Sequence, residues 1–246
     1  MVAKTPAVLL VGGLGTRLRS VLPTTPKPLA PLGKLSFLEL LIRQLRSQGV
    51  SRVVLCTGHL ADQIEREFGD GRKWNLTIEY SREPQPLGTA GAVKLAGRYL
   101  NGSSEFLVMN GDSFLEVDLG QLIQLYRRRH CLVTMAAVQV SNAGRYGTLQ
   151  TDSNGRLIGF LEKTGSDQPG LINAGVYVFN HEILNCIPDG PASLEKDVFP
   201  HILNKGVYVQ VQSGMFIDIG TPEDYVRAQE LCDRLYAVAG SGSKSG

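Results

Sequence analysis

The chain has 246 residues, of which 43% are hydrophobic and 20% charged, and its 25 basic and 23 acidic side chains give a formal charge of +2. This composition excludes disordered and fibrous proteins, and the chain is long enough to bury a core without a structural metal or disulfide. The near-neutral balance lacks the basic surface typical of proteins that bind nucleic acid or anionic membranes. We therefore expect a soluble globular protein with neither nucleic acid nor membrane as a partner.

The cysteines and the N-terminal sequence indicate the cellular compartment of the protein. The four cysteines form no Cys-x-x-Cys pair and the four histidines do not cluster, which argues against a zinc site. Gly12-Gly13 interrupts the apolar run at residues 7–11 before it reaches the length of a signal peptide or membrane span. We expect a cytoplasmic protein with reduced thiols. The sequence leaves the oligomeric state open, a homo-oligomer included.

Short apolar runs alternate with helical patterns through the first half of the chain. This alternation predicts an α/β fold with a mixed, mostly parallel sheet flanked by helices. Ser36 and Glu39 form a capping box that opens the first long helix. In chain order we expect a strand at 7–11, a helix at 36–48, a strand at 52–56, a helix at 60–68, a strand at 76–80, a helix at 89–100 entered at Thr89, a strand at 105–109 and a helix at 118–130.

The second half is richer in strand patterns. Asn154-Gly155 lies between two alternating segments, at 148–150 and 157–161, and is a strong hairpin signal. Thr221-Pro222 is typical of a helix start, with Thr as the cap and Pro in the first turn. The remaining expected elements are a strand at 172–179, a helix at 194–203, strands at 207–211 and 216–219, and a final helix after Thr221.

The segment directly after the first strand is glycine-rich, reading Gly12-Gly13-Leu14-Gly15-Thr16-Arg17-Leu18. Its backbone N–H groups could bind phosphate, and the guanidinium of Arg17 suits bidentate phosphate contact. The segment lacks the Gly-Lys-Ser/Thr of a P-loop, and Leu18 stands where the dinucleotide fingerprint needs its last glycine. A glycine turn that serves only tight packing is the alternative.

Lys27 lies between Pro26 and Pro28, and we expect these prolines to hold the chain extended and present the ammonium near the glycine loop. A proline-rich surface strap is the alternative. Together, Gly-Gly-x-Gly-Thr-Arg-Leu and the following Pro-Lys-Pro-Leu resemble the signature of the sugar-1-phosphate nucleotidyltransferases, whose later motifs also follow in order.

This resemblance implies a Rossmann-like nucleotide-diphospho-sugar transferase fold and assigns roles to the two motifs. Arg17 and Lys27 would neutralise the reacting phosphates and the leaving pyrophosphate. The residues implied to bind the nucleotide phosphates are Gly12, Gly13, Gly15 and Thr16, and those implied to read the base are Gln85, Gly88 and Thr89. Without the resemblance, Gly88 and Thr89 would be explained as a helix start alone.

Two carboxylates point to a magnesium site. Asp112 follows the strand at 105–109, at the edge where open α/β sheets bind ligands. Asp218 lies within an apolar strand, where an unpaired carboxylate is costly, so a cation should meet it. Two carboxylates that converge with phosphate oxygens suit Mg²⁺, and Asp112 resembles the family's first magnesium ligand. A turn aspartate and a buried ion pair are the respective alternatives.

Three further motifs match the family's sugar side. Tyr146-Gly147 and Asn173 resemble its sugar-contacting turns. Glu162-Lys163 resembles a pair in which the acid binds sugar hydroxyls and the lysine binds the sugar phosphate. Taken alone, Glu162-Lys163 would be a solvated strand end and Asn173 a capped strand edge.

The implied reaction joins an NTP and a sugar 1-phosphate to give an NDP-sugar and pyrophosphate, by Mg²⁺-dependent in-line attack on the α-phosphorus. The chain looks most like the D-glycero-D-manno-heptose 1-phosphate guanylyltransferases, so GTP and the heptose phosphate are the expected partners. Mannose-1-phosphate guanylyltransferase, other uridylyl- or thymidylyltransferases and a non-catalytic nucleotide-sugar-binding protein are the alternatives.

We expect a single domain over residues 1–236. Its nucleotide-binding half would cover about 1–115, and its sugar-binding half, with the second metal carboxylate, about 116–236. The Gly/Ser-rich composition predicts a flexible tail at 237–246.

Overall fold

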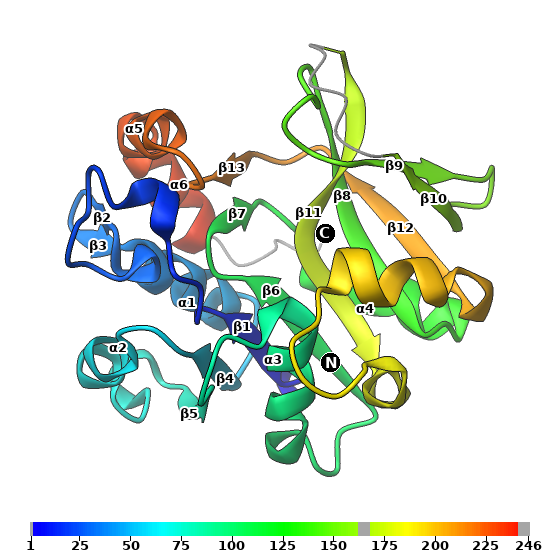
Figure 1. Cartoon of the computed structure of the whole chain (residues 1–246), viewed down its shortest axis with the longest axis horizontal. Helices are drawn as coiled ribbons and strands as arrows, with labels where there is room; N and C mark the ends of the chain where they lie inside the picture. Colours follow the sequence, from blue (N-terminus) through cyan, green and yellow to red (C-terminus); the bar gives the residue numbers. More distant parts are fainter. Residues whose placement is uncertain (1, 162–167, 241–246) are drawn as a thin grey trace.

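The computed structural model describes residues 2–161 and 168–240. Within them, a central sheet of nine strands is flanked by helices, and two small two-stranded sheets lie beside it (Figure 1). None of the helices in these residues is long and apolar enough to span a membrane. The α/β architecture expected from the sequence is confirmed.

The first half of the chain forms the parallel part of the sheet. Leu10 on the first strand pairs with both Cys56 and Asn110, so three strand ends lie side by side. The strands are β1 (Ala7–Leu10), β4 (Arg52–Thr57), β5 (Thr77–Arg82) and β6 (Glu105–Asn110). The helices are α1 (Phe37–Ser47), α2 (Ala61–Phe68), α3 (Gly88–Ala96) and α4 (Leu119–Arg129).

The second half extends this sheet mainly by antiparallel pairing. Its strands are β8 (Val133–Val140), β9 (Thr148–Thr151), β10 (Leu157–Leu161), β11 (Gly170–Asn180) and β12 (Val207–Gln212). The order is β10-β9-β11-β6-β1-β4-β5, β8 also pairs with β11, and β12 is added in parallel to β8. The hairpin expected around Asn154-Gly155 is confirmed by the antiparallel pairing of β9 and β10.

Short elements lie at the carboxyl edge of the sheet. The sequence did not predict β7 (Ser113–Leu115), a buried strand that pairs antiparallel with β13 (Phe216–Asp218). A second small sheet joins β2 (Pro31–Leu32) and β3 (Leu35–Ser36). The chain ends in α5 (Pro222–Glu230) and α6 (Cys232–Gly240). The short helices in 3-10 geometry are Val2–Lys4, Thr16–Leu18, Lys27–Leu29, Arg72–Trp74, Gly97–Tyr99, His181–Cys186, Phe199–His201 and Leu203–Lys205.

The helix caps test the expected boundaries directly. Ser36 accepts from the N–H of Glu39 at 3.3 Å, and Thr221 accepts from the N–H of Asp224 at the same distance, as expected. The helix expected at 194–203 is wrong, because Leu194–Val198 is a single π turn that gives way to the 3-10 turn containing Pro200. α6 also continues to Gly240, so the first four residues of the expected tail are helical.

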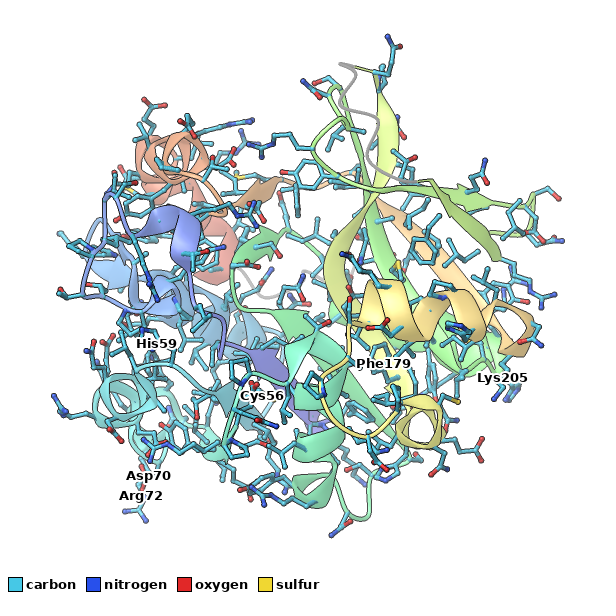
Figure 2. The ribbon with its side chains drawn as sticks, viewed as in Figure 1. Cys56, His59, Asp70, Arg72, Phe179 and Lys205 are labelled. Atoms are coloured by element: carbon cyan, nitrogen blue, oxygen red, sulfur yellow. The ribbon has the colours of Figure 1, made fainter. Side chains whose placement is uncertain are left out.

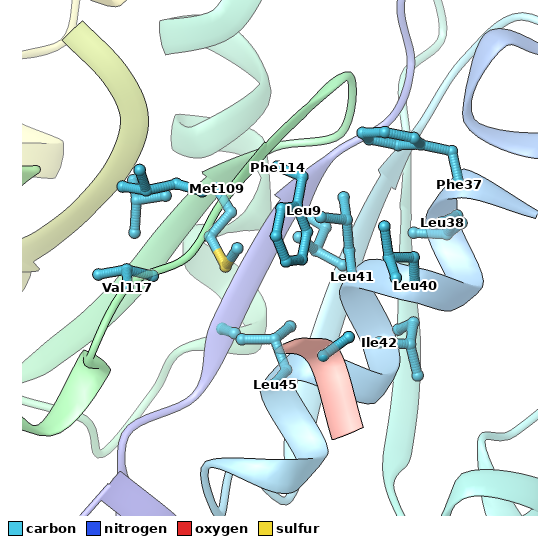
Figure 3. Close-up of a cluster of buried hydrophobic side chains, with 14 of the residues drawn as sticks. Leu9, Phe37, Leu38, Leu40, Leu41, Ile42, Leu45, Met109, Phe114 and Val117 are labelled. Atoms are coloured by element: carbon cyan, nitrogen blue, oxygen red, sulfur yellow. The ribbon is translucent and has the colours of Figure 1, made fainter. Parts of the chain in front are cut away.

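Apolar side chains fill both faces of the sheet. On one face, Leu41 and Leu45 of α1 pack with Leu9, Met109 and Phe114 (Figure 3). The other face is covered by α3 and the segment around the π turn, and it includes the fully buried residues Val54, Val93, Phe106, Tyr177 and Phe199. Burial on both faces makes the sheet a fixed platform for the loops at its edge.

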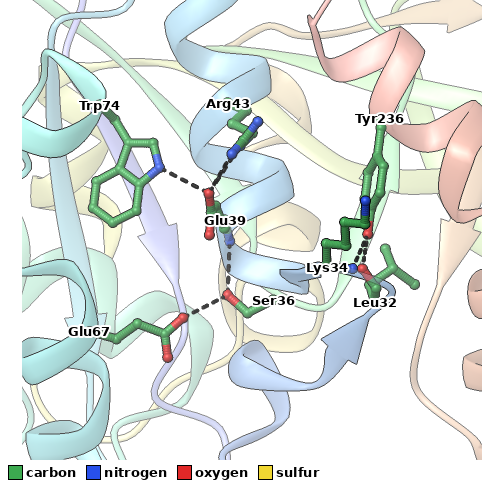
Figure 4. Close-up of polar contacts among 8 residues, drawn as sticks. All are labelled: Leu32, Lys34, Ser36, Glu39, Arg43, Glu67, Trp74 and Tyr236. Atoms are coloured by element: carbon green, nitrogen blue, oxygen red, sulfur yellow. Dashed lines mark hydrogen bonds and ion pairs between the residues drawn. The ribbon is translucent and has the colours of Figure 1, made fainter.

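Polar contacts attach surrounding segments to α1 and to the small β2-β3 sheet. Glu39 accepts hydrogen bonds from Arg43 and from the indole of Trp74, and the hydroxyl of Tyr236 on α6 accepts from the N–H of Lys34 at 3.0 Å (Figure 4).

Cys56 lies buried in β4, where burial raises the pKa of its thiol (Figure 2). This agrees with a core role for Cys56.

Candidate active site

A cavity of about 290 Å³ opens at the carboxyl ends of β1 and β6. Its wall is built from the glycine loop, the lysine of the Pro-Lys-Pro segment, Glu83, part of the segment 86–92 and the turn after β6. The predicted site residues that line it are Gly12, Gly13, Lys27, Gly88, Thr89 and Asp112. Motifs far apart in the sequence therefore converge on one cavity.

Lys27 and Asp112 form an ion pair inside this cavity. Nζ of Lys27 lies 2.7 Å from Oδ2 of Asp112, with side-chain exposures of 12% and 41%. The extended backbone expected around Lys27 is wrong: Lys27–Leu29 is a 3-10 turn, which tolerates Pro28 because the first turn of a helix needs no N–H at that position. This turn still presents the ammonium to the carboxylate.

Asp218 joins this pair through the small β7-β13 sheet. Asp218 pairs with Ser113, and the N–H of Ile219 donates to the carbonyl of Asp112 at 2.9 Å. Burial raises the pKa of Asp218, and the negative charge of Asp112 raises it further. The N–H of Gly220 and the charge of Lys27 act in the opposite direction. The charge of Asp218 therefore interacts with those of Asp112 and Lys27.

The chemistry of this cluster fits a divalent cation. Asp112 and Asp218 repel each other electrostatically, and Mg²⁺ prefers such hard oxygen ligands. No group of three or more His, Cys, Asp or Glu side chains that could hold a metal occurs in residues 2–161 and 168–240. Asp112 and Asp218 would therefore hold Mg²⁺ together with oxygens of a phosphate ligand or water.

Glu83 is a cavity residue that the sequence reasoning missed. It follows β5 directly, and its Oε2 accepts from the N–H of Leu87 at 2.9 Å. Burial raises the pKa of this half-buried carboxyl. A Cβ atom added to Gly12 would clash with Oε1 of Glu83, so the glycine allows the loop to approach this carboxylate. The position of Glu83 at the carboxyl end of a parallel strand is the signal that could have identified it.

Only part of the segment expected to read the base lines the cavity. Gln85 is exposed and is not among the described residues that line the cavity. Gly88 lines it, with φ of +68°. Thr89 does not begin its helix: α3 starts at Gly88, and Oγ1 of Thr89 accepts from the N–H of Leu194 at 2.8 Å. Thr89 therefore also ties the cavity wall to the π turn.

Arg17 and Thr16 lie outside this wall. Both are exposed on the 3-10 turn Thr16–Leu18, and neither is among the described residues lining the cavity. Gly15 lines a small neighbouring cavity together with Lys27. The loop thus brings its glycines to the carboxylate cluster and leaves the guanidinium of Arg17 in solvent.

Tyr146, expected to contact the sugar, lines a second cavity of about 510 Å³ that also reaches Asp218. Its hydroxyl accepts from Arg145 at 2.9 Å, and Arg145 forms an ion pair with Asp224 of α5 at 2.7 Å. Gly147 follows Tyr146 and precedes β9. Arg145 was not predicted, and it connects the turn of Tyr146 to the helix that follows the strand of Asp218.

Asn173 lies on β11 where its pairing with β8 shifts register. Its side-chain amide donates to the hydroxyl of Tyr177 at 2.7 Å and to Oε1 of Glu195 at 2.9 Å. Its Oδ1 accepts from the N–H of Gly175 at 3.0 Å. The predicted pair at positions 162 and 163, Glu162-Lys163, lies outside the described residues.

Comparison with known proteins places this arrangement in a family. The nucleotidyl transferase family model matches residues 6–234. The chain is 39% identical over 98% of its length to a mannose-1-phosphate guanylyltransferase of Mycobacterium tuberculosis, of which it covers 67%. It is also 39% identical over 91% of its length to D-glycero-alpha-D-manno-heptose 1-phosphate guanylyltransferase of Aneurinibacillus thermoaerophilus, of which it covers 96%.

A solved structure has the same fold. HddC from Yersinia pseudotuberculosis, crystallised in complex with GMP-PN, matches with a TM-score of 0.82 and 35% sequence identity. The match covers 92% of this chain and 98% of HddC. With its glycine loop, lysine and paired carboxylates at one sheet edge, the chain belongs to the nucleotidyl transferase family.

Proposed function

We propose that the protein transfers a guanylyl group from GTP to D-glycero-D-manno-heptose 1-phosphate, releasing pyrophosphate and forming the GDP-sugar. The observation that carries the proposal is the cluster of Lys27, Asp112 and Asp218 beside the glycine loop. Two carboxylates that can bind a cation, next to a mostly buried ammonium, suit a reaction between two phosphate anions. The family match supports nucleotidyl transfer as the reaction class.

The chemistry needs little more than orientation and charge. The attacking phosphate oxygen of the sugar 1-phosphate is already ionised at neutral pH, so no general base is required. Lys27 offsets negative charge at the α-phosphate, and Gly12 and Gly13 leave room for the phosphates to approach the loop. Arg17 and Lys163 are proposed to bind the leaving pyrophosphate and the sugar phosphate, respectively. When bound by Asp112 and Asp218, Mg²⁺ supplies Lewis-acid neutralisation of phosphate charge.

Glu83 supports guanine as the base. Guanine presents two adjacent donors, N1–H and N2–H, and a carboxylate can accept both. Uracil and thymine present one N–H between two carbonyl oxygens, which a carboxylate would repel. Glu83 lines the cavity with Oε1 beside Gly12 and Oε2 accepting from the N–H of Leu87, so a base that enters this cavity would meet its carboxylate.

The choice of sugar depends on the relatives. The match to the heptose enzyme, at 39% identity over 91% of this chain, supports the heptose phosphate as the acceptor. Both relatives are guanylyltransferases at 39% identity, and mannose 1-phosphate is therefore the second candidate acceptor.

The test is pyrophosphate release from each of GTP, UTP, dTTP, CTP and ATP with heptose, mannose, glucose and N-acetylglucosamine 1-phosphates, with Mg²⁺ and with EDTA. We expect release with GTP, the heptose phosphate and Mg²⁺. Release with another NTP and sugar 1-phosphate would support nucleotidyl transfer but contradict the assignment of GTP and the heptose phosphate as substrates. No release from folded protein with any pair would contradict the proposed function and favour a binding protein.

A further inference from the structure

An ion pair fastens the turn that contains Tyr146 to the helix that follows Asp218. A terminal nitrogen of Arg145 lies 2.7 Å from Oδ2 of Asp224 and also donates to the hydroxyl of Tyr146 at 2.9 Å. The side chain of Asp224 is 18% exposed, so the carboxylate end of this pair is mostly buried. A charge-assisted hydrogen bond of this length holds the two segments together.

Asp224 in turn fixes the first turn of α5. Its Oδ2 accepts from the hydroxyl of Thr221 at 2.8 Å, and its N–H donates to the same hydroxyl oxygen at 3.3 Å. Thr221 is the N-cap of α5, and Asp224 lies in the first turn of that helix. The carboxylate of Asp224 therefore links Arg145 to the helix cap.

The cap is continuous with the turn that holds Asp218. The N–H of Gly220 donates to Oδ1 of Asp218 at 2.6 Å, and Gly220 directly precedes Thr221. A Cβ atom added to Gly220 would lie 2.5 Å from the same oxygen, so the backbone of this turn packs closely against the carboxyl group. A displacement of the α5 cap would therefore move the amide that orients Asp218.

The ion pair and Asp218 meet at one cavity. The cavity of about 510 Å³ is lined by Arg145, Tyr146, Asp218 and Asp224, and also by Arg227 of α5. Burial raises the pKa of the Tyr146 hydroxyl and the hydrogen bond from Arg145 lowers it. The negative charges of Asp218 and Asp224 raise this pKa further. The guanidinium and both carboxylates thus act on one half-buried hydroxyl.

We infer that Arg145 is a positioning residue for the cation-binding carboxylate of Asp218. The inference rests on the metal site of the proposed function. Through Asp224 and the cap of α5, the guanidinium holds the amide of Gly220 on one oxygen of Asp218. Removal of groups that orient a metal-binding side chain typically costs about 10- to 100-fold in metal affinity. Arg145 therefore sets the affinity for the cation from outside the set of groups that bind it.

The test measures binding of Mn²⁺, which takes the same oxygen ligands as Mg²⁺ and is followed by electron paramagnetic resonance. The protein is titrated in the presence of GTP and without sugar phosphate, so that no turnover is needed. We expect Arg145→Met to raise the Kd for Mn²⁺ by about tenfold. Loss of a nearby positive charge alone would strengthen cation binding, so weaker binding separates a positioning role from a through-space effect of charge.

Arg227→Met is the matched control. Arg227 is exposed and lines the same cavity, and within residues 2–161 and 168–240 it makes no hydrogen bond or ion pair. Its removal should leave the Kd for Mn²⁺ within about twofold of the wild type or lower it. Arg145→Lys keeps the charge beside Asp224 without the planar guanidinium and should raise the Kd less than Arg145→Met does.

The results that overturn the inference are defined by the same titrations. A Kd for Mn²⁺ in folded Arg145→Met that equals or falls below that of the wild type would overturn it, and so would an equal rise in Arg227→Met. Absence of Mn²⁺ binding to the wild type would also overturn it. If the wild type binds Mn²⁺ but releases no pyrophosphate with any substrate pair, the proposed function fails, and the comparison of Kd values still decides the role of Arg145.

Discussion

Nζ of Lys27 lies 2.7 Å from Oδ2 of Asp112, although 85 positions separate the two residues in the chain. The pair forms because Leu10 on β1 pairs with Asn110 on β6, so that the segments after both strands meet at one edge. Asp218 then reaches the pair through the pairing of β13 with β7. The sheet topology itself therefore assembles the charges that the proposed reaction requires.

Arg17 gives a prediction that separates catalysis from folding. It is exposed and makes no hydrogen bond or ion pair in the described part of the chain. Arg17→Ala should leave the free energy of unfolding unchanged while lowering kcat by roughly 100-fold, which corresponds to about 3 kcal/mol of transition-state stabilisation. Urea unfolding and steady-state kinetics check both parts. Wild-type turnover by the folded variant would refute the role of Arg17.

Glu83 gives a pH-dependent prediction. Burial raises its pKa, so the folded state disfavours its ionised form. Such a carboxyl contributes stability below the unfolded pKa of about 4.3, and that contribution is lost as the pH rises through the folded pKa. Glu83→Gln should therefore be more stable than the wild type at pH 7, with a difference that shrinks toward pH 4, while its kcat/KM for GTP falls by about tenfold or more. A stability difference that is constant with pH in urea titrations would contradict this.

Gly88 and Gly102 form a matched pair, because both have positive φ, of +68° and +84°. A Cβ atom at Gly88 would lie 2.5 Å from the carbonyl oxygen of Ala192, whereas nothing lies within 4 Å of one at Gly102. We expect Gly102→Ala to cost about 1 kcal/mol from backbone strain, and Gly88→Ala to cost about 1–3 kcal/mol more because of overpacking. Chemical denaturation measures both. Equal losses would show that the contact with Ala192 is unimportant.

Thr89 tests the connection between the cavity wall and the π turn. Thr89→Val keeps the shape of the side chain but leaves the N–H of the buried Leu194 without its acceptor. A loss of about 1–3 kcal/mol of unfolding free energy is expected, whereas Thr89→Ser retains the hydroxyl and should lose less than about 1 kcal/mol. Variants that are equally stable would argue against this hydrogen bond.

Local sequence signals predicted much of the fold for identifiable reasons. Capping at Ser36 and Thr221 and the turn at Asn154-Gly155 depend on neighbouring residues alone, and the structure confirms them. The strand β7 was missed because its three residues are stabilised by pairing with β13, about 100 positions later, which no local pattern reveals. Likewise Thr89 has the side chain of an N-cap, and only the tertiary contact with Leu194 explains why it does not act as one.

Sequence motifs predict only some residues of the candidate site. They identify Lys27 and Asp112, and the structure brings these two side chains into contact. Glu83 could not be found in this way, because an acid directly after a strand is usually solvated. Its significance depends on the backbone segments that pack around it. Gln85, by contrast, fits a motif yet lies exposed outside the described cavity wall.

The most direct test of the account is the turnover number of Asp112→Asn with GTP, Mg²⁺ and the sugar 1-phosphate that the wild type uses best. This change keeps the size of the side chain and removes the charge that faces Lys27 and Asp218. We expect kcat to fall by at least about 100-fold, with a thermal unfolding transition that remains cooperative. Turnover within about twofold of the wild type would contradict the assignment of this cluster as the catalytic centre.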